Sequence, residues 1–215
     1  MSNITQSAEI RWFFKGQIPK TVEEWFKSSV HHKFQETRED IYLLFPGSSC
    51  VGVKIREENF EIKPLLSDLG EYTLNEDATG KIEVWEKWKT MGDSGTHFIE
   101  IAKGSADWLK VKKEKMLRKF TFFNSISEIN PDLEIEDGCS LELTRVLIND
   151  INFWTLGFEA YEKKGSGVEI VKGVAKKIMN EEIPLQFELE NGVQSNYSIR
   201  NSCSYPAFLL VRNTI

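Results

Sequence analysis

The sequence predicts an α+β fold in which an antiparallel β-sheet closes into a barrel with a few peripheral helices. Many segments have the strand period of two, while helical periodicity is confined to two stretches. Turn-forming residues separate the strand segments. Closure into a barrel is the most economical end for such a sheet, because it removes the exposed edges. The 215 residues fit one domain spanning 1–215.

The expected strands follow one another along most of the chain. They cover Glu9–Lys15, Arg38–Phe45, Cys50–Arg56, Asn59–Pro64, Lys81–Thr90, Thr96–Lys103, Asp107–Phe123, Cys139–Asn149 and Asn152–Lys163. A short helix is expected over Thr21–Lys27 and a longer one over Val168–Met179, whose apolar residues recur on one face. The polar stretch Gly70–Gly80 is expected to be a loop, and Ser204–Leu210 a short apolar tail.

Composition narrows the function classes. Acidic residues outnumber basic ones by 33 to 27, which gives a net charge of −6 and disfavours a nucleic-acid-binding protein. No apolar stretch approaches the ~20 residues that span a bilayer. The first residues lack the basic and apolar regions of a signal peptide. We therefore expect a cytoplasmic protein without a nucleic-acid or membrane partner.

Charged residues alternate with apolar ones along several strands, and this alternation fits two different barrels. In one, the apolar face points inward and the charges are solvated. In the other, the lumen is polar and the apolar residues pack outward beneath helices and loops. Cations inside such a lumen would need carboxylates or a phosphate chain to balance them. Pairs that share a polar face are Lys54 with Arg56, Glu61 with Lys63, and Lys113 with Lys115.

Nine short segments, taken in chain order, suggest a known family. They are Glu9-Ile-Arg11, Arg38-Glu-Asp40-Ile-Tyr42-Leu43, Val53-Lys54-Ile-Arg56, Phe60-Glu-Ile-Lys63, Glu83-Val-Trp85-Glu86-Lys87-Trp88, Val111-Lys-Lys113-Glu-Lys115, Glu142-Leu-Thr144, Trp154-Thr-Leu-Gly-Phe-Glu159 and Ser204-Tyr205-Pro206. Their order resembles the CYTH superfamily, the triphosphate tunnel fold of class IV adenylyl cyclases, thiamine triphosphatases and inorganic triphosphatases. The resemblance implies a tunnel in which basic residues hold a triphosphate and glutamates hold Mg²⁺ or Mn²⁺.

The resemblance also implies which residues form the site. Its anion-binding residues would be Arg11, Arg38, Lys54, Arg56, Lys63, Lys113 and Lys115, and its metal ligands Glu9, Glu142 and Glu159. The chain departs from the family where Arg11, Thr144 and Tyr161 replace acidic residues. Lost carboxylates and an added guanidinium weaken the binding of a divalent metal. We therefore expect a catalytically eroded protein that binds a phosphorylated or polyanionic small molecule.

Two alternative functions stay open from the sequence. One is a Mg²⁺- or Mn²⁺-dependent triphosphate hydrolase with relocated metal ligands, such as Glu61, Glu83 or Glu159. The other is a carrier of apolar ligands like a lipocalin, which the 14 Phe, 5 Tyr and 6 Trp allow. The lining of the barrel distinguishes them, because an apolar lumen is incompatible with a phosphate-binding protein.

Overall fold

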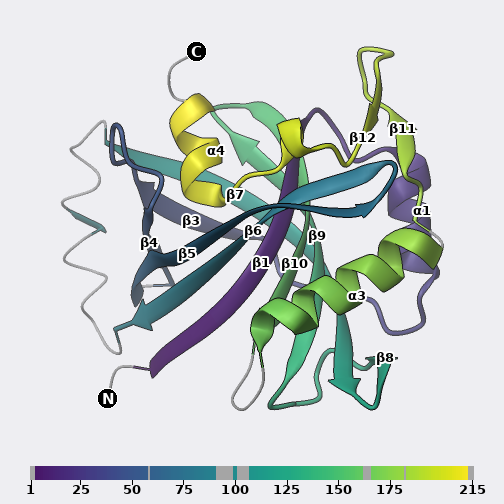
Figure 1. Cartoon of the computed structure of the whole chain (residues 1–215). Coiled ribbons are helices and arrows are strands. Elements are labelled where there is room, and N and C mark those ends of the chain that lie inside the picture. Colours follow the sequence, from purple (N-terminus) through teal and green to yellow (C-terminus); the bar gives the residue numbers. More distant parts are fainter. Residues whose placement is uncertain are drawn as a thin grey trace.

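A computed structural model describes residues 3–57, 59–90, 99–100, 107–161, 166–181 and 183–212 (Figure 1). Eight antiparallel strands form a barrel in the order β7, β3, β4, β5, β6, β1, β10, β9, and β9 pairs back onto β7. They are β1 (Asn3–Lys15), β3 (Arg38–Leu43), β4 (Val51–Arg56), β5 (Asn59–Asn75), β6 (Ala78–Lys89), β7 (Trp108–Phe123), β9 (Gly138–Ile148) and β10 (Ile151–Tyr161). The predicted closed barrel in an α+β fold is confirmed.

Short strands and helices surround this barrel. Strands β2 and β8 pair with β7, and β11 and β12 form a separate hairpin. These additional elements are α1 (Lys20–Ser28), β2 (Lys33–Phe34), β8 (Ser125–Ile129), α3 (Gly167–Glu181), β11 (Gln186–Glu188), β12 (Gln194–Asn196), the 3-10 helix η1 (Ile199–Asn201) and α4 (Tyr205–Arg212). Within the described ranges, no helix has both the length and the apolar character needed to cross a membrane.

The larger hydrophobic core lies on the outer wall of the barrel. Ile10, Trp12 and Phe14 of β1 are buried in it together with apolar residues of α1 and α3. Figure 1 shows α3 lying across the outside of the strands. Because side chains alternate along a strand, Glu9 and Arg11 point the other way, into the lumen. Of the two barrels that fit the alternation, the structure is the one with a polar lumen.

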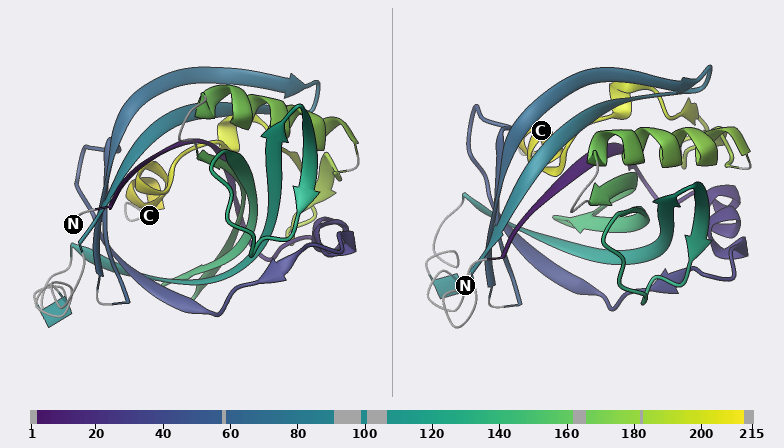
Figure 2. Two further views of the ribbon diagram at one scale, coloured as in Figure 1. Left: turned by 90° about the horizontal axis from the view of Figure 1, so that it is seen from below. Right: turned by 60° about the horizontal axis from the view of Figure 1, so that its bottom comes forward.

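Helix α4 fills one end of the barrel from inside. Phe208 and Leu209 pack in a second apolar cluster with Phe13 and Phe153, where β1 ends and β10 begins. The rings of Phe13 and Phe208 stack with their centroids 4.1 Å apart. In the view along the barrel, α4 lies within the ring of strands (Figure 2). The expected short apolar tail is therefore a helix that closes off the lumen.

The expected loop over Gly70–Gly80 is wrong, because β5 and β6 continue as a long hairpin through this stretch. Leu74 and Ala78 are buried in the core that α3 covers, and the Asn75 side chain donates a hydrogen bond to the backbone oxygen of Met179. Packing against α3 thus stabilises strands that their polar composition does not predict.

One further strand differs from the sequence prediction, and one predicted strand lies almost entirely outside the described residues. Strand β8 was not expected, and Asn124, in the left-handed region with φ 57°, forms the tight turn that joins it to β7. The strand predicted over Thr96–Lys103 lies outside the described residues except for Ile99 and Glu100, which are helical.

Candidate functional site

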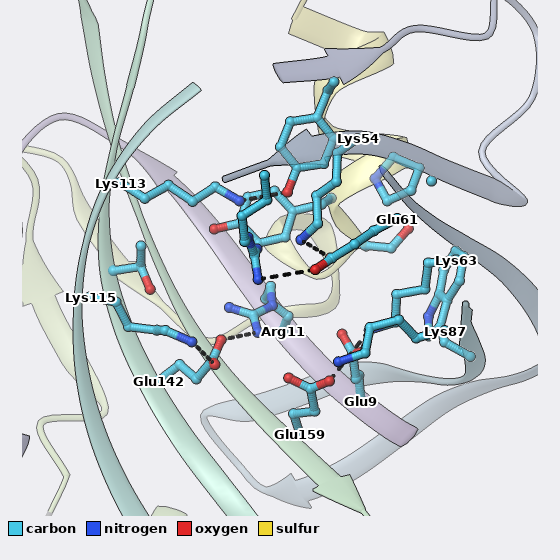
Figure 3. A pocket seen from close by; sticks show the side chains of 18 of the residues that line it. Glu9, Arg11, Lys54, Glu61, Lys63, Lys87, Lys113, Lys115, Glu142 and Glu159 are labelled. Carbon is cyan, nitrogen blue, oxygen red and sulfur yellow. Dashed lines mark hydrogen bonds and ion pairs between the residues drawn. The ribbon is translucent and has the colours of Figure 1, made fainter. Parts of the chain in front are cut away.

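The lumen contains a pocket of about 130 Å³ that is lined mostly by charged side chains (Figure 3). All seven predicted anion-binding residues and all three predicted metal ligands line it. These are Arg11, Arg38, Lys54, Arg56, Lys63, Lys113 and Lys115, with Glu9, Glu142 and Glu159. Other described lining residues include Tyr42, Glu61, Trp85, Lys87, Thr144, Ser204 and Tyr205.

Strand pairing explains why these residues meet. Residues opposite each other on neighbouring strands point to the same side of a sheet. Arg38 of β3 pairs with Lys113 of β7, and Lys54 of β4 pairs with Glu61 of β5. The barrel curvature then brings charged side chains from opposite walls together in one enclosed space.

Asp40 organises the basic side chains at one side of the pocket. Its side chain is fully buried, and Arg56 donates two hydrogen bonds to it, at 2.8 and 2.9 Å. The Lys113 ammonium lies 3.1 Å from Asp40 Oδ2, while Lys54 and Arg38 form longer ion pairs at 3.8 and 3.7 Å. Burial alone would raise the pKa of Asp40, but the surrounding cations outweigh it and hold that pKa well below its usual range.

Glu61 is the second carboxylate of this basic group. The Lys54 ammonium lies 3.0 Å from Glu61 Oε2, and Arg56 Nη1 lies 3.9 Å from Oε1. Burial, together with the charge of Arg56, lowers the pKa of Lys54 to about 8. Burial also lowers the pKa of Lys113 well below its usual value, although Asp40 opposes the shift. We name Arg38, Lys54, Arg56, Lys113, Asp40 and Glu61 the Asp40 cluster.

Lys113 also contacts two aromatic rings. Its ammonium donates a hydrogen bond of 2.6 Å to the Tyr42 hydroxyl. The same nitrogen lies 3.7 Å from the ring centroid of Tyr205 and 4.7 Å from that of Tyr42. Tyr205 belongs to α4, so the helix that fills the barrel end also forms part of the pocket wall. These cation–π contacts partly offset the free-energy cost of removing the Lys113 ammonium from water.

A second charged group lies around Arg11. Arg11 Nη2 donates a hydrogen bond of 2.7 Å to Glu142 Oε2, and Lys115 donates one to the other oxygen of the same carboxylate. Lys63 contacts both Glu9 and Glu159. Figure 3 shows Arg11 near the middle of these labelled side chains. We name Arg11, Lys63, Lys115, Glu9, Glu142 and Glu159 the Arg11 cluster.

The predicted metal ligands are engaged by cations. Glu9 and Glu159 each pair with Lys63, and Glu142 pairs with both Arg11 and Lys115. In the described residues, no group of three or more His, Cys, Asp or Glu side chains has the arrangement of a metal site. A divalent ion bound to these glutamates would have to displace the three cationic side chains that pair with them, and their positive charges would repel it. These residues therefore do not fit Mg²⁺ or Mn²⁺.

Several buried polar atoms of the pocket make no hydrogen bond within the described part of the chain. They include Nε and Nη1 of Arg11, Nε of Arg38, and the hydroxyls of Thr144 and Ser204. Arg11, Thr144 and Ser204 are 5, 2 and 7% exposed. Because buried polar groups in proteins are almost always hydrogen-bonded, these atoms indicate a place for a polar ligand or ordered water.

The sequence identified most of the pocket but missed the role of Asp40. Asp40 is two residues from Arg38 on the same strand, so the alternation places both on one face. This spacing is the feature of the sequence from which the place of Asp40 beside the basic residues could have been predicted. No family model matches this chain, and comparison with curated protein sequences also finds no match. Its function is therefore inferred from the pocket.

Proposed function

We propose that this chain binds a phosphorylated or otherwise polyanionic small molecule in the barrel lumen, like a CYTH protein that no longer depends on a metal. The excess of positive charge in the pocket carries this proposal. Eight Lys and Arg side chains and four glutamates are among the described lining residues, and the buried Asp40 adds a fifth carboxylate. Uncompensated charge in an enclosed space is costly, and a bound anion would offset it.

The types of side chain favour phosphate oxygens as the ligand atoms. Guanidinium groups present N–H donors in a planar fork that matches phosphate geometry, and lysines add compact charges. Arg38 is suited to this role because it lines the pocket and, among the described residues, its guanidinium has one ion pair, at 3.7 Å with Asp40. An apolar ligand of the lipocalin type would instead exclude water from these charged groups without offering them a hydrogen bond, which disfavours that alternative.

Calorimetric titration with tripolyphosphate and with inorganic phosphate, in a buffer containing a metal chelator, tests the proposal. We expect at least one of these anions to bind, and Arg38→Ala to weaken its binding at least tenfold, because a charge-assisted hydrogen bond contributes about 1.5–3 kcal/mol. Lys112→Ala is the matched control, because it also removes one positive charge but from an exposed position on β7, outside the pocket. The proposal fails if the wild-type protein binds neither these anions nor a sugar phosphate.

The second candidate is a metal-dependent triphosphate hydrolase. One observation favours it, namely that Glu9, Glu142 and Glu159 line the same pocket as the basic residues. Phosphate release from tripolyphosphate and ATP, with Mg²⁺ or Mn²⁺, tests this candidate. We expect no release above background, because Glu9, Glu142 and Glu159 are paired with cationic side chains and are not free to hold the metal that assists phosphoryl transfer. Metal-dependent turnover that Lys54→Ala abolishes would establish the hydrolase instead.

A further inference from the structure

The two charged groups of the pocket differ in net charge. The Asp40 cluster holds four cations against two carboxylates, so it carries a formal excess of two positive charges. The Arg11 cluster holds three cations against three glutamates and is formally neutral. Lys87 is the remaining described cation of the lining and is half-buried beside the Glu61 side of the pocket. The positive excess is therefore concentrated in the Asp40 cluster.

The size of this excess limits the charge of the ligand head. Burial lowers the pKa of Lys54 to about 8 and also lowers the pKa of Lys113 well below its usual value, so the excess is at most two at neutral pH. A phosphate monoester carries a charge of about −1.5 to −2 at this pH. Such a group would balance the Asp40 cluster almost completely and favour the charged form of both lysines.

The neutral Arg11 cluster offers hydrogen bonds rather than charge. At its centre are N–H groups of Arg11 that make no hydrogen bond to any described residue, and the hydroxyls of Thr144 and Ser204 in the same pocket make none either. The carboxylates of Glu142, Glu9 and Glu159 lie in the same cluster and would repel additional phosphoryl groups. This half of the pocket thus suits an uncharged group rich in hydroxyl or carbonyl oxygens.

We infer that the lumen takes a phosphate monoester whose dianionic head lies on the Asp40 cluster and whose uncharged, oxygen-rich body lies on the Arg11 cluster, in preference to longer polyphosphates. The inference rests on the proposed function and specifies its ligand class. A tripolyphosphate of similar length would place its extra negative charges beside three glutamates, whereas a sugar body would meet the buried donors that have no partner.

Calorimetric titrations with ribose 5-phosphate, inorganic phosphate, pyrophosphate and tripolyphosphate, at one pH and ionic strength without metal, test the inference. We expect ribose 5-phosphate to bind at least tenfold more tightly than tripolyphosphate and more tightly than inorganic phosphate. Tighter binding of tripolyphosphate would overturn this inference and leave the proposed function standing. Equal affinities for ribose 5-phosphate and inorganic phosphate would overturn the subsite for the body. Binding of none of the four would overturn both proposals.

Two substitutions separate the head from the body. Thr144→Val keeps the side-chain shape but removes the unpartnered hydroxyl, so ribose 5-phosphate should bind about five- to tenfold more weakly while inorganic phosphate is unaffected. An equal loss for both ligands would contradict the assignment of Thr144 to the body.

Glu159→Gln makes the Arg11 cluster positive, so the affinity for pyrophosphate should rise relative to that for ribose 5-phosphate. An unchanged ratio would contradict the electrostatic basis of the selectivity. Thermal unfolding confirms that each variant is folded.

Discussion

The guanidinium of Arg11 lies against the backbone of Gly157, so closely that a Cβ added at residue 157 would come within 2.5 Å of Arg11 Cζ. In the sheet, Gly157 pairs with Arg11 on one side and with Glu142 on the other. Because Gly157 has no side chain, Arg11 can cross the intervening strand and form its 2.7 Å ion pair with Glu142. The positive charge at the centre of the Arg11 cluster thus depends on a glycine.

Gly157→Ala should destabilise the protein by about 1–3 kcal/mol, because the new methyl group would force Arg11 off Glu142. The free energy of unfolding in urea measures this effect. In an Arg11→Ala background the same substitution should have little effect, since the atoms that it would meet are absent. Equal losses in the two backgrounds would show that Arg11 is not what excludes a side chain at residue 157.

Asp40→Asn should lower the free energy of unfolding by about 3–5 kcal/mol, because it leaves four buried or half-buried cations without their shared carboxylate. Added phosphate should restore part of this loss, and should raise the melting temperature more in the variant than in the wild type. Thermal unfolding with and without phosphate measures both effects. A variant as stable as the wild type would contradict the central role of Asp40.

Anion binding should weaken as the pH rises through about 8. Burial lowers the pKa of Lys54 to about 8, and a bound anion favours the protonated form, so above this pH binding requires the uptake of a proton. Phosphate monoesters lose their second proton at about pH 6 and cannot cause this change. Dissociation constants measured below and above pH 8 should show this weakening of anion binding. In Lys54→Arg, whose guanidinium stays charged, the change near pH 8 should disappear; persistence would assign it to another group.

Stability should fall at acidic pH, partly through Glu159. Burial would raise its pKa, but the charge of Lys63 outweighs this and lowers the pKa to about 2. A lowered folded-state pKa contributes stability that is present above the unfolded value of about 4.3 and is lost as the pH falls through about 2. Urea unfolding at several acidic pH values measures the slope. Glu159→Gln should reduce it, whereas Glu188→Gln, at an exposed carboxylate, should not.

The strand pattern in the sequence determined much of the pocket. Period-two alternation is local, so it correctly places Lys54 with Arg56 and Lys113 with Lys115 on shared faces. It could not decide which face is the inside of the barrel. That choice depends on α1 and α3, which bury the apolar face of β1 on the outer wall and leave Arg11 for the lumen.

Only the tertiary structure decided which charges balance one another. The sequence alone predicts most of the barrel strands, their polar faces and the basic residues that a phosphate could contact. Asp40 joins Arg38 of its own strand to Arg56 and Lys113, which come from neighbouring strands 16 and 73 residues further along the chain. Electrostatic pairing depends on distance in space, and barrel closure sets those distances. The sequence therefore determined which charges share a strand face, and the fold determined that this face lines the lumen and where the excess charge lies.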